Sequence, residues 1–401
     1  MQVLANDPLF VDGLDLGVVL FVIVKALLGF TFVMVGVIVL IWFERKVISD
    51  MQNRIGPNRA GPWGLLQTLA DGIKLIFKED LRPDRADHLV YRMAPYMSVA
   101  PAFLTFCIVP IGGVFTGGDD GAVKLFGHTT YLQVADPPVG VLFLLAMSSV
   151  AVYGVMLAGW SSGSKYPLLG SVRASAQMVS YEAALGLSVV TVILLTGSLS
   201  THDIVASQAG RLLDWNAIAT AFVPFAIFCV AATAELNRPP FDLVEAEQEL
   251  VGGFHTEYSS IRFGMFYLAE FMNTITMSAI IITLFLGGPA GPIGPGPEQV
   301  WPIFWFMLKL VVFLFAFVWV RATLPRFRYD QLMDLGWKRL IPLALGWLLL
   351  IAALRIAGDQ EWSKPLVVGG ALVTMLAAAG LMFGAIRVAE LRRGEAEEVR
   401  T

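Results

Sequence analysis

The stretch Leu16-Gly-Val-Val-Leu-Phe-Val-Ile-Val-Lys-Ala-Leu-Leu-Gly-Phe-Thr-Phe-Val-Met-Val-Gly-Val-Ile-Val-Leu-Ile-Trp-Phe43 contains a single charged residue, Lys25. About 20 consecutive apolar residues are enough for an α-helix to cross the hydrocarbon core of a bilayer. No cationic segment precedes this run and no small-residue cleavage site follows it, so we expect a retained span and not a signal peptide.

Comparable apolar runs recur along the 401 residues. Hydrophobic residues make up 56% of the chain and charged residues 15%, whereas a soluble domain has about 25% charged residues. The sequence therefore predicts an all-α polytopic membrane protein, residues 1–401 forming a single integral membrane domain of about nine transmembrane helices. The predicted spans are residues 16–43, 91–115, 138–160, 173–197, 217–236, 262–287, 301–322, 339–357 and an additional C-terminal span at 365–388.

Lysine and arginine are distributed unequally between the two sides of these spans. With span-end residues assigned to the nearer side, 22 of the 28 lysines and arginines fall on one side. Cytoplasmic connections carry the excess of cationic residues, so this side is predicted to be cytoplasmic. The N-terminus is then outside and the C-terminus inside, and the expected location is a bacterial cytoplasmic (inner) membrane.

The residue inventory gives no site for a cofactor. Two cysteines cannot supply the four thiolates of an iron–sulfur cluster, and the four histidines are scattered. No glycine-rich phosphate-binding loop is present. We expect that this chain binds no metal or cofactor of its own and has no nucleic-acid partner.

Three predicted cytoplasmic connections, residues 44–90, 237–261 and 321–338, are dense in arginine, acidic and aromatic residues, while the outer connections are rich in Gly and Pro. This contrast indicates that function is built on the cytoplasmic face. Amphipathic and loop helices are expected there.

The first of these connections contains an amphipathic pattern over residues 64–78, with Asp71 and Lys74 on the polar face at an i,i+3 spacing. Such a helix either anchors the chain at the membrane surface or lines the route of an amphipathic ligand. Arg45 and Arg54 are either general positive-inside charge or arginines placed for binding, and the rigid Gly-Pro-Asn turn after Arg54 favours placement.

The stretch Glu235-Leu-Asn-Arg-Pro-Pro-Phe-Asp-Leu-Val-Glu-Ala-Glu-Gln-Glu-Leu250 holds five carboxylates. If residues 241–251 are helical, Asp242, Glu245 and Glu249 share one face, for which a solvated acidic surface is a sufficient explanation. Glu247 then lies among apolar neighbours. Burial there would raise the pKa of Glu247, and crowding of like charges would raise others.

Two further carboxylates, Glu182 and Glu270, fall near the middle of predicted spans. An acid at that depth is costly and by default marks a route for ions or protons. The alternative is a neutral glutamic acid in a structural hydrogen bond between helices. Together with Glu235 they would form a hydrated chain from the cytoplasmic loop into the membrane, while Lys309 is expected to extend outward to the interface.

Five motifs in these connections closely resemble one family. They are Glu44-Arg-Lys46, Asn53-Arg-Ile-Gly-Pro-Asn-Arg59, Ala234-Glu-Leu-Asn-Arg-Pro-Pro-Phe-Asp242, Glu257-Tyr-Ser259 and Arg326-Phe-Arg-Tyr-Asp-Gln331. They resemble the H subunit of respiratory complex I, the proton-pumping NADH:quinone oxidoreductase, over roughly residues 15–345. The charged tail and the ninth span lie outside these motifs.

The resemblance implies a membrane subunit of a translocase of the respiratory chain that forms much of the quinone tunnel and couples quinone reduction to proton translocation through buried glutamates. It implies quinone as substrate, with flavin and iron–sulfur clusters in partner subunits. Expected partners are peripheral-arm subunits on the cytoplasmic side, neighbouring membrane-arm subunits and lipids. The implied quinone-binding residues are Glu44, Arg45, Arg54, Asp71, Lys74, Arg238 and Arg321. The implied relay residues are Glu182, Glu235, Asp242, Glu245, Glu247 and Glu270.

Three other functions remain open at this point. The homologous anchor subunit of a membrane-bound hydrogenase shares the arginine and glutamate motifs but does not reduce quinone. A stand-alone proton-coupled transporter would also carry membrane glutamates, but it would not need such motif-rich loops on one face. A purely structural anchor would not need acids in mid-membrane.

Overall fold

The computed structural model describes residues 7–10, 13, 15–115, 120–125, 127–243, 250–360, 369–370 and 380. The chain forms two compact units, residues 1–341 and 342–401. Apart from three residues, the predicted ninth span at 365–388 lies outside the described part of the chain, as does the charged tail. The span therefore stays a prediction, as does the assignment of the whole chain to one integral membrane domain.

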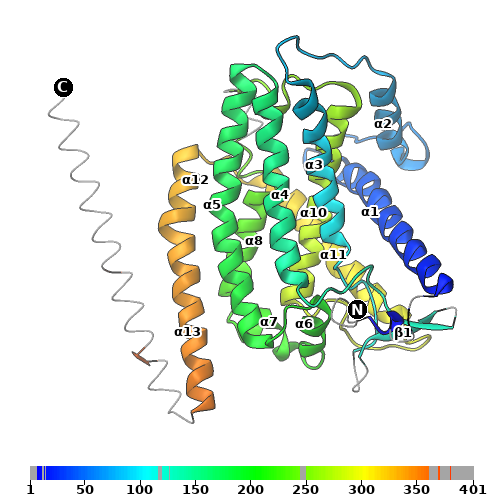
Figure 1. Ribbon diagram of the computed structural model, residues 1–401, viewed down its shortest axis with the longest axis vertical. Coiled ribbons are helices and arrows are strands. Elements are labelled where there is room, and N and C mark those ends of the chain that lie inside the picture. Colours follow the sequence, from blue (N-terminus) through cyan, green and yellow to red (C-terminus); the bar gives the residue numbers. More distant parts are fainter. Residues whose placement is uncertain are drawn as a thin grey trace. The chain divides into compact units, whose positions relative to one another are not determined.

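Helices dominate the described residues (Figure 1). In chain order the elements are η1 (Pro8–Phe10), α1 (Leu16–Met51), η2 (Pro62–Gly64), α2 (Gln67–Phe77), α3 (His88–Phe106), β1 (Ala122–Leu125), β2 (His128–Tyr131), α4 (Gly140–Ser161), α5 (Lys165–Thr196), α6 (Thr201–Ser207), η3 (Leu212–Asp214), α7 (Asn216–Ala219), α8 (Val223–Glu235), η4 (Gly253–His255), α10 (Ser260–Phe285), α11 (Val300–Thr323), α12 (Tyr329–Leu335), a π-helical turn (Gly336–Leu340) and α13 (Ile341–Asp359).

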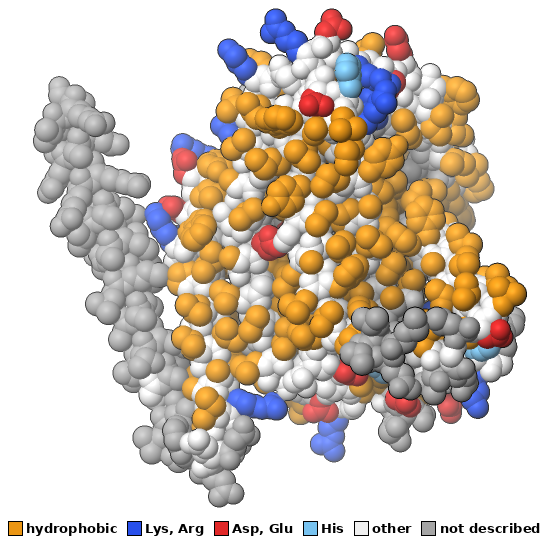
Figure 2. Space-filling model, viewed as in Figure 1, with side chains coloured by type: hydrophobic (Ala, Val, Ile, Leu, Met, Phe, Trp, Pro, Cys, Tyr) orange, Lys and Arg blue, Asp and Glu red, His pale blue; other side chains and the backbone are white. Residues whose placement is uncertain are grey.

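Within these residues six helices are long and apolar enough to cross a membrane: α1, α4, α5, α10, α11 and the continuous helical stretch from Tyr329 to Gly358. α3 and α8 occupy two more of the predicted spans. The predicted fold class, an all-α polytopic membrane protein, is confirmed. On the face formed by α3, α4 and α5, apolar side chains cover the height of the helices, and most charged side chains lie at the two ends (Figure 2).

The bundle of the first unit is built around α10. In the most apolar part of α10, 83% of the residues are buried, against 17% in α1 and α11. α3, α4 and α5 stand side by side, while α1 is inclined away from them and α2 lies near the C-terminal end of α1 (Figure 1). The centre of the first unit is therefore the place where buried polar groups of α10 meet the other helices.

Helix α1 continues well beyond the predicted span. Its 36 residues extend about 54 Å, which exceeds the roughly 30 Å of the hydrocarbon core. No helix breaker occurs until Asn53, which has a positive φ of 53°, and the Gly56-Pro57 pair. The motif at residues 44–46 consequently lies on the last turns of a rigid helix and not in a loop.

The predicted span at 217–236 is interrupted. α7 ends at Ala219, and α8 begins at Val223 and has only 13 residues. Ala221 and Phe222 have positive φ angles of 54° and 62° between the two helices. Pro224 in the first turn of α8 has no N–H for a preceding helical turn, so the chain cannot continue α7 into α8.

The amphipathic helix forms as α2, close to the predicted range. It follows a tight turn in which Gly64 has φ +79°, and a Cβ there would lie 2.4 Å from the carbonyl oxygen of Pro57. Only glycine fits this position. At the other end the hydroxyl of Ser260 donates to the carbonyls of Leu75 and Lys78, so α2 is attached to the start of α10.

The connection between α3 and α4 contains an antiparallel pair of strands, β1–β2, that the sequence did not predict. The predicted outward extension of Lys309 to the interface stays a prediction. Its ammonium is part-buried and donates to the carbonyls of Leu286, Gly288 and Ala290 at 2.8–2.9 Å. These bonds hold the C-terminal end of α10 against α11.

Candidate functional site

Four predicted site residues from separate elements meet at one end of the bundle, which is predicted to be cytoplasmic. Arg238, after α8, lies 3.2 Å from Glu44 of α1 and 2.6 Å from Glu270 of α10. The other carboxylate oxygen of Glu44 pairs with Arg321 of α11. Arg238 is 6% exposed, and buried charges persist in proteins when they are paired in this way. We call these four residues the arginine–glutamate cluster.

The loop that carries Arg238 is held in place by the buried side-chain amide of Gln177. Gln177 of α5 donates hydrogen bonds to the carbonyl oxygens of Ala234 at 2.7 Å and Phe241 at 3.0 Å. Arg238 also stacks its guanidinium over the ring of Phe271, 4.3 Å from the ring centroid. The position of the guanidinium is thus set by α5 and α10 and not by the loop alone.

Asp242 corrects the prediction of a solvated acidic face. Its side chain is 10% exposed and lies 3.0 Å from Arg326 of the 321–338 connection. Phe241 stacks on Phe327 at 5.5 Å, and the N–H of Phe327 donates to the carbonyl of Pro240, so the two loops are joined here. A buried ion pair between loops explains Asp242 better than contact with water.

The rest of the predicted acidic helix lies largely outside the described residues. Residues 241–243 are not helical, so the helix does not begin at Phe241. Glu245 and Glu247 lie in the undescribed segment, as does Glu249, and their roles and the facing of Glu247 stay predictions.

A cavity of about 440 Å³ opens beside the cluster, between α1, the turn that follows it and α2. It is lined by Glu44, Arg45, Arg54 and Gln67, three of which were predicted to contact quinone. Pockets for small ligands typically occupy about 300–1,000 Å³. Glu44 therefore belongs both to the arginine–glutamate cluster and to a cavity of ligand size.

Asp71 of α2 contacts two residues that line this cavity, Arg45 and Gln67. Its carboxylate lies 2.7 Å from Arg45 and 3.7 Å from Lys74, and it accepts a hydrogen bond from Gln67 at 3.2 Å. Partial burial raises the pKa of Asp71, but the hydrogen bond and charge of Arg45, supported by Gln67 and Lys74, outweigh burial and hold the pKa below its usual value. Asp71 is thus a stable anion. Arg45 is its closer partner, whereas Lys74 is largely exposed.

The membrane carboxylates lie deeper. Glu182 of α5 accepts a hydrogen bond from Ser149 of α4. Glu235, at the end of α8, is 7% exposed and within electrostatic range of Glu182. Two internal cavities, of about 60 and 20 Å³, share Glu235 in their linings, and the larger one also contains Glu270. Two of the predicted relay residues, Glu235 and Glu270, thus line the same internal cavity, and Glu182 lies near Glu235.

His255 also lines the larger of these two cavities. Its ring packs against Phe254 at 5.0 Å, Phe263 at 5.2 Å and Tyr267 at 6.4 Å. Burial lowers the pKa of His255 to about 4, because the charged imidazolium would lose its hydration. The imidazole is therefore neutral at physiological pH.

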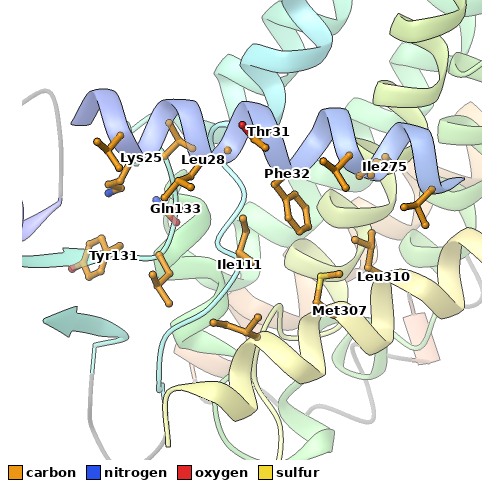
Figure 3. Close-up of a pocket in the computed structure, with 18 of the residues that line it drawn as sticks. Lys25, Leu28, Thr31, Phe32, Ile111, Tyr131, Gln133, Ile275, Met307 and Leu310 are labelled. Atoms are coloured by element: carbon orange, nitrogen blue, oxygen red, sulfur yellow. The ribbon is translucent and has the colours of Figure 1, made fainter. Parts of the chain in front are cut away.

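A larger apolar groove of about 740 Å³ lies elsewhere, between α1 and α11 (Figure 3). Phe32, Met307 and Leu310 contribute to its walls, and Lys25 is the one charged residue among the described residues that line it. Lys25 is held by Asp7 at 2.8 Å. Because this groove is lined mainly by apolar side chains, whereas Glu44, Arg45 and Arg54 line the smaller cavity, we assign the site to the smaller cavity.

Two site contacts were missed from the sequence, those of Arg326 with Asp242 and of Ser149 with Glu182. Arg326 lies in a motif that was recognised, but nothing local to it indicates a partner 84 residues away. Among the described residues no group of three or more His, Cys, Asp or Glu side chains is arranged to hold a metal ion.

The sequence is similar to one family of known proteins. A family model described as NADH dehydrogenase matches residues 24–352. The H subunit of NADH-quinone oxidoreductase from Frankia alni is 51% identical over 358 residues, which cover 88% of this chain and 77% of the relative. The proteins of the same description from Streptomyces avermitilis and Cutibacterium acnes are 48% and 46% identical, covering 88% and 90% of this chain and 78% and 85% of the relatives.

Proposed function

Because the chain belongs to the NADH dehydrogenase family, and within it to the H subunits of NADH-quinone oxidoreductase, we propose that it binds quinone at its cytoplasmic end and couples quinone reduction to proton translocation. It is a membrane subunit of a multi-subunit oxidoreductase. Its enzymatic activity is that of the complex, in which the electron carriers reside in other subunits.

The double role of Glu44 is the observation that carries this proposal. Its carboxylate lines the 440 Å³ cavity and contacts Arg238, which in turn contacts Glu270. A quinone head in the cavity gains negative charge as it is reduced, and that charge acts first on the arginines around Glu44. Movement of Arg238 or Arg321 then changes the field at Glu270, since charges a few ångströms apart interact strongly away from water.

From Glu270 the proposed pathway continues through Glu235 to Glu182. All three carboxylates lie on membrane helices, where an acid is costly unless it is paired, neutral or hydrated. In this proposal each carboxylate responds to the charge state of the one before it. The undescribed acids Glu245 and Glu247 would join the pathway from the loop side.

The same proposal includes the partner subunits and lipids around this chain and the side of the membrane on which each terminus lies. Peripheral-arm subunits bearing flavin and iron–sulfur clusters would dock on the cytoplasmic loops 44–90, 237–261 and 321–338. Membrane-arm subunits and lipids would cover the apolar helices. The N-terminus would lie outside the bacterial inner membrane and the C-terminus in the cytoplasm.

The test compares two acceptors in the assembled complex. Lys74→Ala and Asp71→Asn should slow the reduction of a membrane quinone and leave electron transfer from NADH to a hydrophilic acceptor unchanged. Asp71→Asn should have the larger effect, because it breaks the contact with Arg45 that joins α2 to α1. If both activities fell equally at equal complex content, the proposed binding site would be wrong.

A further inference from the structure

The two internal cavities meet at a buried carboxylate with an unused oxygen. Glu235 lines both cavities and is 7% exposed. Within the described residues its Oε2 atom has no hydrogen-bond partner. Leaving such a buried oxygen without a partner is unfavourable, so a polar molecule in the cavities would stabilise this arrangement.

Asn273 is the other polar residue common to both cavities. It lies three residues after Glu270 on α10, so the two side chains share a face about 4.5 Å apart along the helix axis. An asparagine amide offers two donor hydrogens and an acceptor oxygen. In the part of the chain that the structure describes, the Asn273 side chain makes no hydrogen bond to protein.

The sizes of the cavities match one kind of ligand. A water molecule needs about 10–15 Å³ of space for its centre and two to four polar partners. The larger cavity has about 60 Å³ and is lined by Ser98, Asn237 and Tyr267 in addition to the two glutamates. The smaller has about 20 Å³, enough for one water, and is lined by Thr105, Ser148 and Thr276.

We propose that Asn273 anchors bound water between Glu270 and Glu235 and that this water makes the two carboxylates one proton-exchanging unit. The inference rests on the proposed function, because it assigns to the same pathway a residue that is neither acidic nor charged. Asn273 is a positioning residue here: its amide holds the water and does not itself gain or lose a proton.

The proton step balances without any other reactant. A proton leaves the carboxylic acid of Glu270 and forms an O–H bond with the water, while the water releases one of its own protons to the carboxylate of Glu235. The water is regenerated, and the negative charge has moved from Glu235 to Glu270. The reverse transfer follows the same geometry, so the direction is set by the charges of Arg238 and Arg321 near Glu270.

Asn273→Leu tests the water site, because leucine has the same branching as asparagine but no hydrogen-bonding groups. In the assembled complex in inverted membrane vesicles we expect quinone-coupled turnover and proton pumping to fall about tenfold or more, as for loss of a positioned proton-transfer group. Asn273→Ser should retain most of both, since a hydroxyl and extra space can still hold water. Thr274→Val is the matched control: the Thr274 hydroxyl bonds only its own helix backbone, and Thr274 lines neither cavity.

A second measurement requires no change at the asparagine. Exchange of the wild-type complex into H₂¹⁸O should shift water O–H stretching bands in the infrared difference spectrum of turnover, and Glu235→Gln should alter those bands. Absence of any shifted band would overturn the inference even if Asn273→Leu failed to assemble.

The outcomes distinguish the water link at Asn273 from the proposed pathway through the carboxylates. If Glu235→Gln stops pumping while Asn273→Leu stays within about twofold of wild type, the water link is wrong and the proposed pathway stands. Normal pumping in both variants would overturn the pathway itself. Loss in Asn273→Leu with retention in Asn273→Ser supports the water link.

Discussion

At the scale of single residues, the site consists of a small number of charged side chains that pair with one another. Arg238 faces two carboxylates, Glu44 and Glu270, and Glu44 faces a second arginine, Arg321. Arg238 and Glu44 have lost most of their hydration and are compensated by their neighbours, whereas the Arg321 side chain is 37% exposed. Removal of one member therefore affects the others more than any exposed ion pair would.

Arg238→Leu is expected to destabilise the protein by about 3 kcal/mol or more, because it leaves Glu270 and one oxygen of Glu44 buried without their partner. The amount of assembled complex in the membrane measures this. Adding Glu270→Gln to the Arg238→Leu variant should recover part of the loss, since it removes one uncompensated charge. Arg211→Leu, at an exposed outer position, should change the amount little. No recovery in the double variant would contradict this account.

His255 gives a prediction for acid sensitivity. Burial lowers its pKa from 6.5 to about 4, so between these values the unfolded segment binds more protons than the folded one. Stability is therefore full above pH 6.5, falls as the pH drops, and levels off below pH 4; the loss reaches about 2 kcal/mol at pH 5.

Thermal inactivation of the complex at pH 7 and pH 5 measures this effect. His255→Gln removes the titrating group, so the variant should lose less heat resistance between the two pH values than the wild type does. An equal loss in both proteins would assign the acid sensitivity to other groups.

At the scale of elements, the position of α2 is set by its two ends. Gly64 allows the turn that precedes it, and Ser260 attaches its last turn to α10. The helix itself buries no residue fully within this chain, so these end contacts and the pairing of Asp71 with Arg45 determine where its polar face lies.

Gly64 lies before α2 and Gly72 lies within it, and substitution by alanine should have opposite effects at these two positions. Gly64→Ala forces a Cβ against the Pro57 carbonyl at φ +79° and should displace α2, lowering quinone reduction while the complex still assembles. Gly72→Ala places its Cβ in open space within α2 and should preserve activity, with helix stability raised by up to about 1 kcal/mol. Similar effects of the two substitutions on quinone reduction would contradict this view of α2.

Sequence reasoning succeeded where local pattern determines structure. A membrane span must satisfy its backbone hydrogen bonds internally, so long apolar runs predicted α4, α5, α10 and α11. The sequence did not predict the break before α8 or the extension of α1 to Met51, because these depend on turn geometry and helix length. It also did not predict the pairing of Asp242 with Arg326, because this pairing depends on the packing of two distant loops.

At the scale of the whole molecule, the described contacts connect the cavity beside Glu44 to Glu270 of α10 through one buried cluster. The predicted orientation places that cavity on the inner side. A cysteine at exposed position 84, between α2 and α3, should react with an impermeant maleimide only in inverted vesicles, and a cysteine at exposed position 299 only in intact cells. The reverse labelling pattern would show that the orientation inferred from the charges is wrong.

The closed set of charges formed by Glu44, Arg238, Glu270 and Arg321 also constrains how the sequence can diverge. A single change at any of these positions creates an uncompensated charge, so lineages that carry one change alone are selected against. These four positions are expected to be either retained together or replaced together. An acid lost at position 270 should be accompanied by a change at position 238, although the two positions lie far apart in the sequence and belong to different elements.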